Sequence, residues 1–167
     1  MKYDFDFIEA ISCWMNYGQS DKEAKDDLLK LTIPAKFKTI NKPIFRVMAM
    51  NSPEDYYQDV GSYTTSKAVI QEFIQSIHFI DSFRGKEHAY LLYIKNPINS
   101  NCILNINSIF KDREFLDSIE YYESSGKYFD EGLEFKDSQK EVVYVANKNE
   151  FDNIFELQRN AKWKKIK

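Results

Sequence analysis

The sequence predicts an α+β domain in which helices come first and a mostly antiparallel sheet follows. Apolar side chains recur at helical spacing in the first 40 residues, and short β-prone runs separated by turn residues follow them. The composition of 13 Phe, 11 Tyr and 2 Trp beside a charged fraction of 29% supplies enough apolar surface for a packed core. No repeat or linker interrupts the 167 residues, so we expect a single domain over 1–167, with a helical lead-in at 1–40 and a core at 42–160.

Two helices are expected in the lead-in. Residues 4–17 place apolar side chains three and four residues apart, and Gly18 follows where a C-terminal cap glycine belongs. The segment SDKEAKDDLLKL begins with Ser20 and has Glu23 three residues later, which is the pattern of a capping box. We therefore expect a second helix that is capped by Ser20 and ends before Pro34.

The core alternates expected strands with two more helices. The runs that predict strands are IFRVMAM (44–50), AYLLYIK (89–95), CILNIN (102–107) and EVVYVA (141–146). After a turn-rich segment at 51–61, an apolar stripe predicts a helix that ends near Ile80, and Ser108 is the expected cap of another. The segment NEFDNIFELQRN fits a strand and a helix equally well, and the basic end KWKKIK is expected to be a solvated tail.

Composition and missing motifs exclude several classes of function. The formal net charge of −3 gives no general case for binding to nucleic acid or to an anionic membrane. The chain has only His78 and His88, which we interpret as ordinary boundary residues, and it lacks zinc-binding, P-loop and GxGxxG patterns. Cys13 and Cys102 are expected to be free thiols. We expect no signal peptide, no membrane-spanning run and no metal, and hence a cytoplasmic protein.

Three polar elements lie in or beside the predicted strands. Arg46 sits in the middle of the first strand, Ser62 and Thr64 precede a helix, and Gln139 and Glu141 stand at the start of a late strand. In this order they resemble the arginine, Ser-x-Ser/Thr and [Gln/Glu]-x-Glu signature of the R-S-E clade of mono-ADP-ribosyltransferases. The chain is most similar to the small Alt/Mod-type enzymes of tailed phages.

The resemblance covers about residues 42–147 and implies a two-sheet core, with three departures from the family pattern. Val47 follows the arginine where the family often has glycine, and the hydroxyl triplet is Ser-Tyr-Thr. Gln139 replaces the first glutamate of Glu-x-Glu. In the family, Gln-x-Glu is commoner among enzymes that modify asparagine and Glu-x-Glu among those that modify arginine, so the acceptor residue stays open.

The resemblance implies NAD as co-substrate and a role for each motif residue. Glu141 would hydrogen-bond the ribose 2′-hydroxyl and stabilise the positive charge that develops as nicotinamide leaves. Arg46 would hold a phosphate or ribose of NAD, because its planar fork binds such groups more specifically than lysine does. Ser62 would fix the rotamer of Glu141, Thr64 would support the pocket wall, and Gln139 would meet the acceptor.

Two further assignments come from the same resemblance. The segment SFRGK at 82–86 is similar to the family's phosphate and nicotinamide loop, in which Phe83 would stack and Arg84 would reach the pyrophosphate. Phe135 and Tyr128 correspond to an aromatic residue used in target recognition. Taken singly, these residues also fit structural roles. Arg46 fits a surface arginine, Glu141 fits an exposed glutamate at the start of a strand, and Phe83 and Phe135 fit aromatics of the core or its rim.

We therefore expect an NAD-dependent mono-ADP-ribosyltransferase, a pentosyl transferase of the phage or bacterial effector type that acts in the host cytosol and resembles toxins. A host protein is the favoured acceptor and RNA is the runner-up. Contacts to RNA phosphates need clustered basic residues, and the basic character of this chain is weak. The alternatives are a catalytically inactive module of the same fold that binds NAD or a partner, and a structural α+β domain without a nucleotide.

Overall fold

The computed structural model describes residues 3–51, 60–76, 86, 88–129, 132–133, 140–157 and 162–167. The helices are α1 (Phe5–Tyr17), α2 (Lys22–Lys30), α3 (Lys67–Ile74), α5 (Ile106–Ile109) and α6 (Arg113–Ser124). The strands are β1 (Ile44–Met50), β2 (Val60–Thr64), β3 (His88–Ile94), β4 (Cys102–Asn105), β5 (Glu141–Val145), β6 (Asn153–Leu157) and β7 (Trp163–Lys165). The predicted α+β class, with helices leading, is confirmed.

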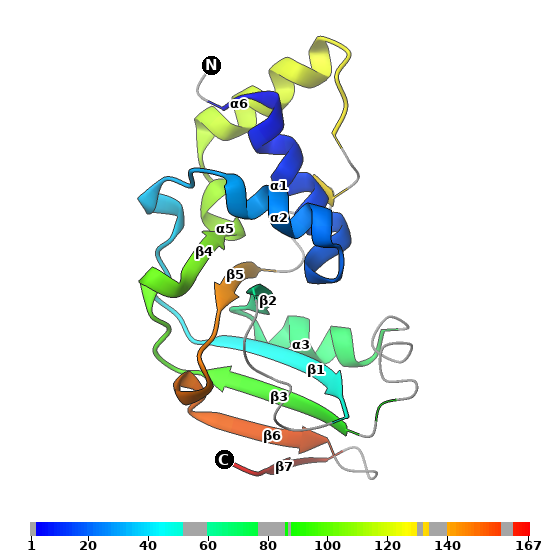
Figure 1. Ribbon diagram of the computed structural model, residues 1–167, viewed down its shortest axis with the longest axis vertical. Helices are drawn as coiled ribbons and strands as arrows, with labels where there is room; N and C mark the ends of the chain where they lie inside the picture. Colours follow the sequence, from blue (N-terminus) through cyan, green and yellow to red (C-terminus); the bar gives the residue numbers. More distant parts are fainter. Residues whose placement is uncertain are drawn as a thin grey trace.

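The strands form one antiparallel sheet in the order β4-β5-β2-β1-β3-β6-β7. Strands β1 and β3 pair along their whole length, whereas β1 and β2 share one register pair, Phe45 opposite Thr64. Figure 1 shows that β4 and β5 run at a steep angle to β1, β3 and β6. The expected two-sheet core is not confirmed, because hydrogen bonds join both halves through this narrow joint.

The helix boundaries are set by caps that the sequence patterns located only in part. Gly18 ends α1 with a φ of 64°, as expected. Asp21 rather than Ser20 caps α2, and Asp112 rather than Ser108 caps α6. The two predicted serine caps are wrong, because Ser20 lies in the 3-10 turn Gly18–Ser20 before α2 and Ser108 lies inside α5. The aspartates at the caps also place a negative charge at the positive end of each helix dipole.

The strands differ from the sequence prediction in three segments, and a fourth segment that the sequence left undecided contains a strand. Strand β2 occupies Val60–Thr64, where the sequence predicted turns followed by a helix. The segment 102–107 is split, because β4 ends at Asn105 and α5 begins at once. The undecided segment contains β6, and the expected tail contains β7, which pairs with β6 and places exposed lysines on the edge of the sheet. Lysines on an edge strand discourage pairing with other chains.

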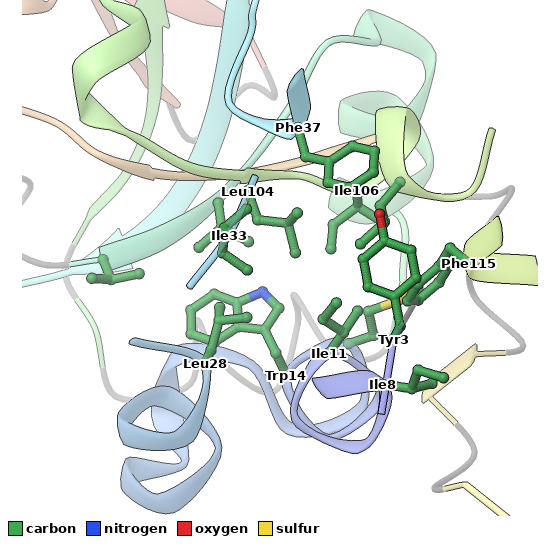
Figure 2. Close-up of a cluster of buried hydrophobic side chains, with 14 of the residues drawn as sticks. Tyr3, Ile8, Ile11, Trp14, Leu28, Ile33, Phe37, Leu104, Ile106 and Phe115 are labelled. Atoms are coloured by element: carbon green, nitrogen blue, oxygen red, sulfur yellow. The ribbon is translucent and has the colours of Figure 1, made fainter. Parts of the chain in front are cut away.

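The core consists of three apolar clusters on the two faces of the sheet. The first lies between the helices α1, α2, α5 and α6 and one face of β2, β4 and β5, at one end of the molecule in Figure 1. Figure 2 shows Trp14 of α1 among the side chains of this cluster. The second lies on the opposite face and includes Tyr63, Leu92 and Val142, and the third packs α3 against β1 and β3.

Candidate functional site

Strands β2 and β5 bring two of the sequence motifs into contact. Thr64 lies opposite Glu141 and Ser62 lies opposite Val143. Because alternate residues of paired strands share a face, Ser62, Thr64 and Glu141 all lie on the side of the sheet that α1 covers. The Ser62 Oγ donates a hydrogen bond of 2.5 Å to the Glu141 Oε1.

A second donor to Glu141 comes from outside the motifs. The Nε1 of Trp14 donates a buried hydrogen bond of 2.8 Å to the same Oε1. The apolar stripe of the first helix identified Trp14 only as a core residue. The signal that could have singled it out is chemical, since a buried indole N–H needs an acceptor.

The Glu141 side chain is buried, with 5% of its surface exposed, and its electrostatics reflect this position. Burial raises the pKa of Glu141 above the usual value for glutamate. The hydrogen bonds from Ser62 and Trp14 and the charge of Arg46 act in the opposite direction and lower the pKa. A buried carboxylate with specific donors is costly to keep, and such groups concentrate at functional sites.

Arg46 lies next to the joint between β1 and β2, but on the other face of the sheet. Its neighbour Phe45 pairs with Thr64, so Arg46 shares a face with Tyr63 rather than with Ser62. The guanidinium carbon of Arg46 lies 5.4 Å from the centre of the Tyr63 ring, a cation–π distance. The structure thus brings Ser62 and Glu141 into contact and places Arg46 within electrostatic reach of Glu141.

Thr64 contacts the backbone of Lys140, the residue just before Glu141. Lys140 has a φ of 50°, in the left-handed region that non-glycine residues seldom adopt. Its carbonyl accepts hydrogen bonds from the Thr65 N–H at 3.1 Å and, at longer range, from the Thr64 and Thr65 hydroxyls. These contacts hold Lys140 in this conformation, so the support that Thr64 gives is to the backbone just before Glu141.

Of the other predicted site residues, Tyr128 is the one that the structure describes. Gln139, Phe83, Arg84 and Phe135 lie outside the described residues. Tyr128 is 78% exposed, on the segment that follows α6. Within the part of the chain that the structure describes, the donors that reach Glu141 come from α1 and β2.

The comparisons with known proteins leave the family of the chain open. Neither family models, nor curated proteins, nor solved structures gave a match. Within the part of the chain that the structure describes, no group of three or more histidine, cysteine or acidic residues is arranged to hold a metal ion. In that same part, no helix combines the length and apolar character needed to cross a membrane. The assignment of a function therefore rests on the geometry around Glu141.

Proposed function

We propose that the chain is an NAD-dependent mono-ADP-ribosyltransferase in which Glu141 is the catalytic residue. It would cleave the bond between nicotinamide and ribose and transfer ADP-ribose to a host macromolecule in the cytosol, with a protein side chain as the favoured acceptor. The observation that carries the proposal is the hydrogen bond from Ser62 to Glu141, which joins two sequence motifs 79 residues apart.

A fixed, buried carboxylate suits this reaction. As the bond to nicotinamide breaks, positive charge develops on the ribose and the transition state resembles an oxocarbenium ion. A carboxylate held in place in surroundings of low dielectric stabilises that charge more strongly than one in water. Within the described residues, the donors Ser62 and Trp14 both end on Oε1. We assign the other oxygen, Oε2, to the 2′-hydroxyl of the ribose.

Arg46 would bind a second part of the NAD molecule, a phosphate or a ribose. It is half-buried, permanently charged and held against the Tyr63 ring, so its guanidinium is oriented before a phosphate or ribose arrives. The steep bend of the sheet at the β1–β2 joint would then take the place of the two-sheet core of the family, with NAD crossing the joint between Arg46 and Glu141.

Transfer of a label from NAD tests the proposal. Purified protein is incubated with a bacterial lysate and NAD labelled in its adenylate part, and we expect a labelled macromolecule with the wild type and none with Glu141→Ala. Digestion with protease or with ribonuclease then distinguishes a protein acceptor from RNA, because the label is lost with its carrier. Labelling that survives Glu141→Ala unchanged contradicts the proposal.

A non-catalytic module that binds NAD or a partner is the second candidate. The 5% exposure of Glu141 favours it, as does buried Val47 where the family often has glycine. Calorimetry separates the two, since NAD binding without transfer and without release of nicotinamide supports the module. If saturating NAD does not raise the melting temperature, the chain has no NAD function of either kind, because a ligand of the native state must stabilise it.

A further inference from the structure

We infer that helix α1 belongs to the catalytic apparatus, with Trp14 as a positioning residue that orients the Glu141 carboxylate toward NAD. The inference rests on the proposed function and adds a residue to it that lies outside all three motifs. Its basis is the hydrogen bond from the Trp14 Nε1 to the Glu141 Oε1, which spans 127 residues of sequence.

The donor in this bond is rigid. Trp14 is 1% exposed and packed in the apolar cluster that Figure 2 shows, so its ring has little freedom to turn. An indole N–H can only donate, and its bond to an ionised carboxylate is charge-assisted. Trp14 therefore defines a fixed point in space for one oxygen of Glu141.

Two donors from different elements fix the carboxylate better than one. The last torsion of a glutamate side chain is broad, so a single hydrogen bond leaves the carboxylate free to swing about it. Ser62 approaches Oε1 from β2 and Trp14 approaches it from α1. With Oε1 held from two sides, Oε2 has one defined direction, which is what a preorganised site requires.

Two described residues between α6 and β5 also rest on α1. Phe129 stacks on Phe5 of this helix with ring centres 4.9 Å apart. At Gly132, a Cβ atom would clash with the Ser12 carbonyl oxygen, so the glycine backbone lies directly against the helix. The same helix thus supplies a donor to Glu141 and contacts Phe129 and Gly132.

The described surroundings of Glu141 predict a signature in its titration. The groups that act on the carboxylate are Ser62 from β2, Trp14 from α1 and the charge of Arg46 from β1, and all three favour the ionised form. Removal of the Trp14 donor should therefore raise the pKa of Glu141. A purely structural role of Trp14 predicts a loss of stability without this change.

Nuclear magnetic resonance of the wild type tests the contact without any substitution. The chain has a second tryptophan, Trp163, which lies on β7 in a different cluster and serves as the internal control. We expect the Trp14 indole proton to titrate with the midpoint of the Glu141 carboxyl carbon, and this titration to vanish in Glu141→Gln. If the chemical shift of the Trp14 indole proton does not change as Glu141 ionises, the inference is overturned.

Trp14→Phe then tests the role in the reaction, with Phe37→Leu as the matched control. Phe37 is buried in the same cluster, and its loss also reduces apolar volume. We expect Trp14→Phe to raise the pKa of Glu141, to move the acid limb of NAD cleavage to higher pH, and to lower turnover on the order of tenfold to a hundredfold. We expect Phe37→Leu to affect stability alone.

The remaining outcomes also decide the question. If Trp14→Phe behaves like Phe37→Leu, or if it increases turnover, Trp14 does not position Glu141 and the inference is overturned. The resonance measurements need no turnover, so an inactive wild type would overturn the proposed function separately. Whether Trp14 and Glu141 titrate together then still decides whether the helix holds the carboxylate.

Discussion

The two ends of strand β5 each have a glutamate beside them, and the two carboxylates are bound in different ways. Glu150, in the turn that follows β5, accepts from the Tyr144 hydroxyl on Oε1 at 2.6 Å. Its Oε2 accepts from the Asn101 side chain at 2.9 Å and from the Asn147 N–H at 2.6 Å. Glu141, at the start of β5, receives both described donors on one oxygen.

We interpret this difference as the one between a structural carboxylate, Glu150, and the catalytic carboxylate that we propose, Glu141. Glu150 uses both oxygens to tie neighbouring segments together, and it forms a capping box with Asn147. Glu141 is more deeply buried, yet within the described residues neither donor takes Oε2. Burial of the Glu141 carboxylate costs stability. A function that needs this carboxylate explains why the fold keeps it.

The largest expected effect is on cleavage of NAD. Glu141→Gln should lower turnover on the order of 10² to 10³, because the neutral amide no longer stabilises the charge on the ribose. Glu150→Gln should leave turnover within a few-fold of the wild type, about the effect of a change that does not touch the reaction. The measurement is release of nicotinamide at saturating NAD. Equal losses in both variants would erase the distinction between the two ends of β5.

The next effect concerns Arg46. Arg46→Lys should raise the KM for NAD by about tenfold to a hundredfold, because lysine loses the planar fork and the stacking on Tyr63. Arg113→Lys, on the exposed face of α6, is the matched control and should leave the KM unchanged. Steady-state kinetics with NAD as the varied substrate provides the comparison. An unchanged KM in Arg46→Lys removes Arg46 from the site.

The two glutamates should also differ in the sign of their effect on stability. Glu150→Gln should lower the free energy of unfolding by about 1 to 3 kcal/mol, because an amide nitrogen in place of Oε2 cannot accept from Asn101 and Asn147. Glu141→Gln should raise it by about 1 kcal/mol, since the amide keeps an oxygen for Ser62 and Trp14 and removes a buried charge. Denaturant unfolding measures both, and a loss of stability in each would contradict the assignment.

The smallest effect is the pH dependence of that stabilisation. Burial raises the pKa of Glu141 above 4.5, so the folded chain binds this proton more tightly than the unfolded chain does. The stability due to the neutral form is present below 4.5 and is lost as pH rises through the raised pKa. The advantage of Glu141→Gln in melting temperature should therefore shrink on acidification, over the range in which the wild type loses activity. If the melting temperature of Glu141→Gln exceeds that of the wild type by more at low pH than at neutral pH, this account is contradicted.

The elements that the sequence predicted well are those with a local apolar period, such as α1, β1, β3 and β5. Strand β2 was missed because Gly61 and Ser62 have little strand preference, and it is pairing with β5, about 80 residues later, that makes this segment a strand. Strand β7 was missed for the same reason. Its lysines have little strand preference, and pairing with β6 makes this segment a strand. Ser66, just after β2, caps α3, because its side chain accepts from the Val69 N–H.

The candidate site was predictable to the extent that its residues form motifs. Ser62 and Glu141 were singled out because the order of the motifs resembles the mono-ADP-ribosyltransferase signature, and the structure brings the two side chains together. The donor role of Trp14 could not be predicted, because a periodic pattern assigns it to the core and does not identify an acceptor 127 residues away. Arg46 lies on the same face of the sheet as Tyr63 because of the register at the β1–β2 joint. No local pattern in the sequence determines this register.

A crystal structure of the Glu141→Gln protein with NAD tests the central claim most directly, because this variant should bind the dinucleotide without consuming it. We predict that the 2′-hydroxyl of the nicotinamide ribose lies within hydrogen-bonding distance of the side chain at position 141. We also predict that the Arg46 guanidinium contacts a phosphate or ribose of the same molecule. NAD bound elsewhere, or bound at position 141 with Arg46 touching no part of it, would contradict the account.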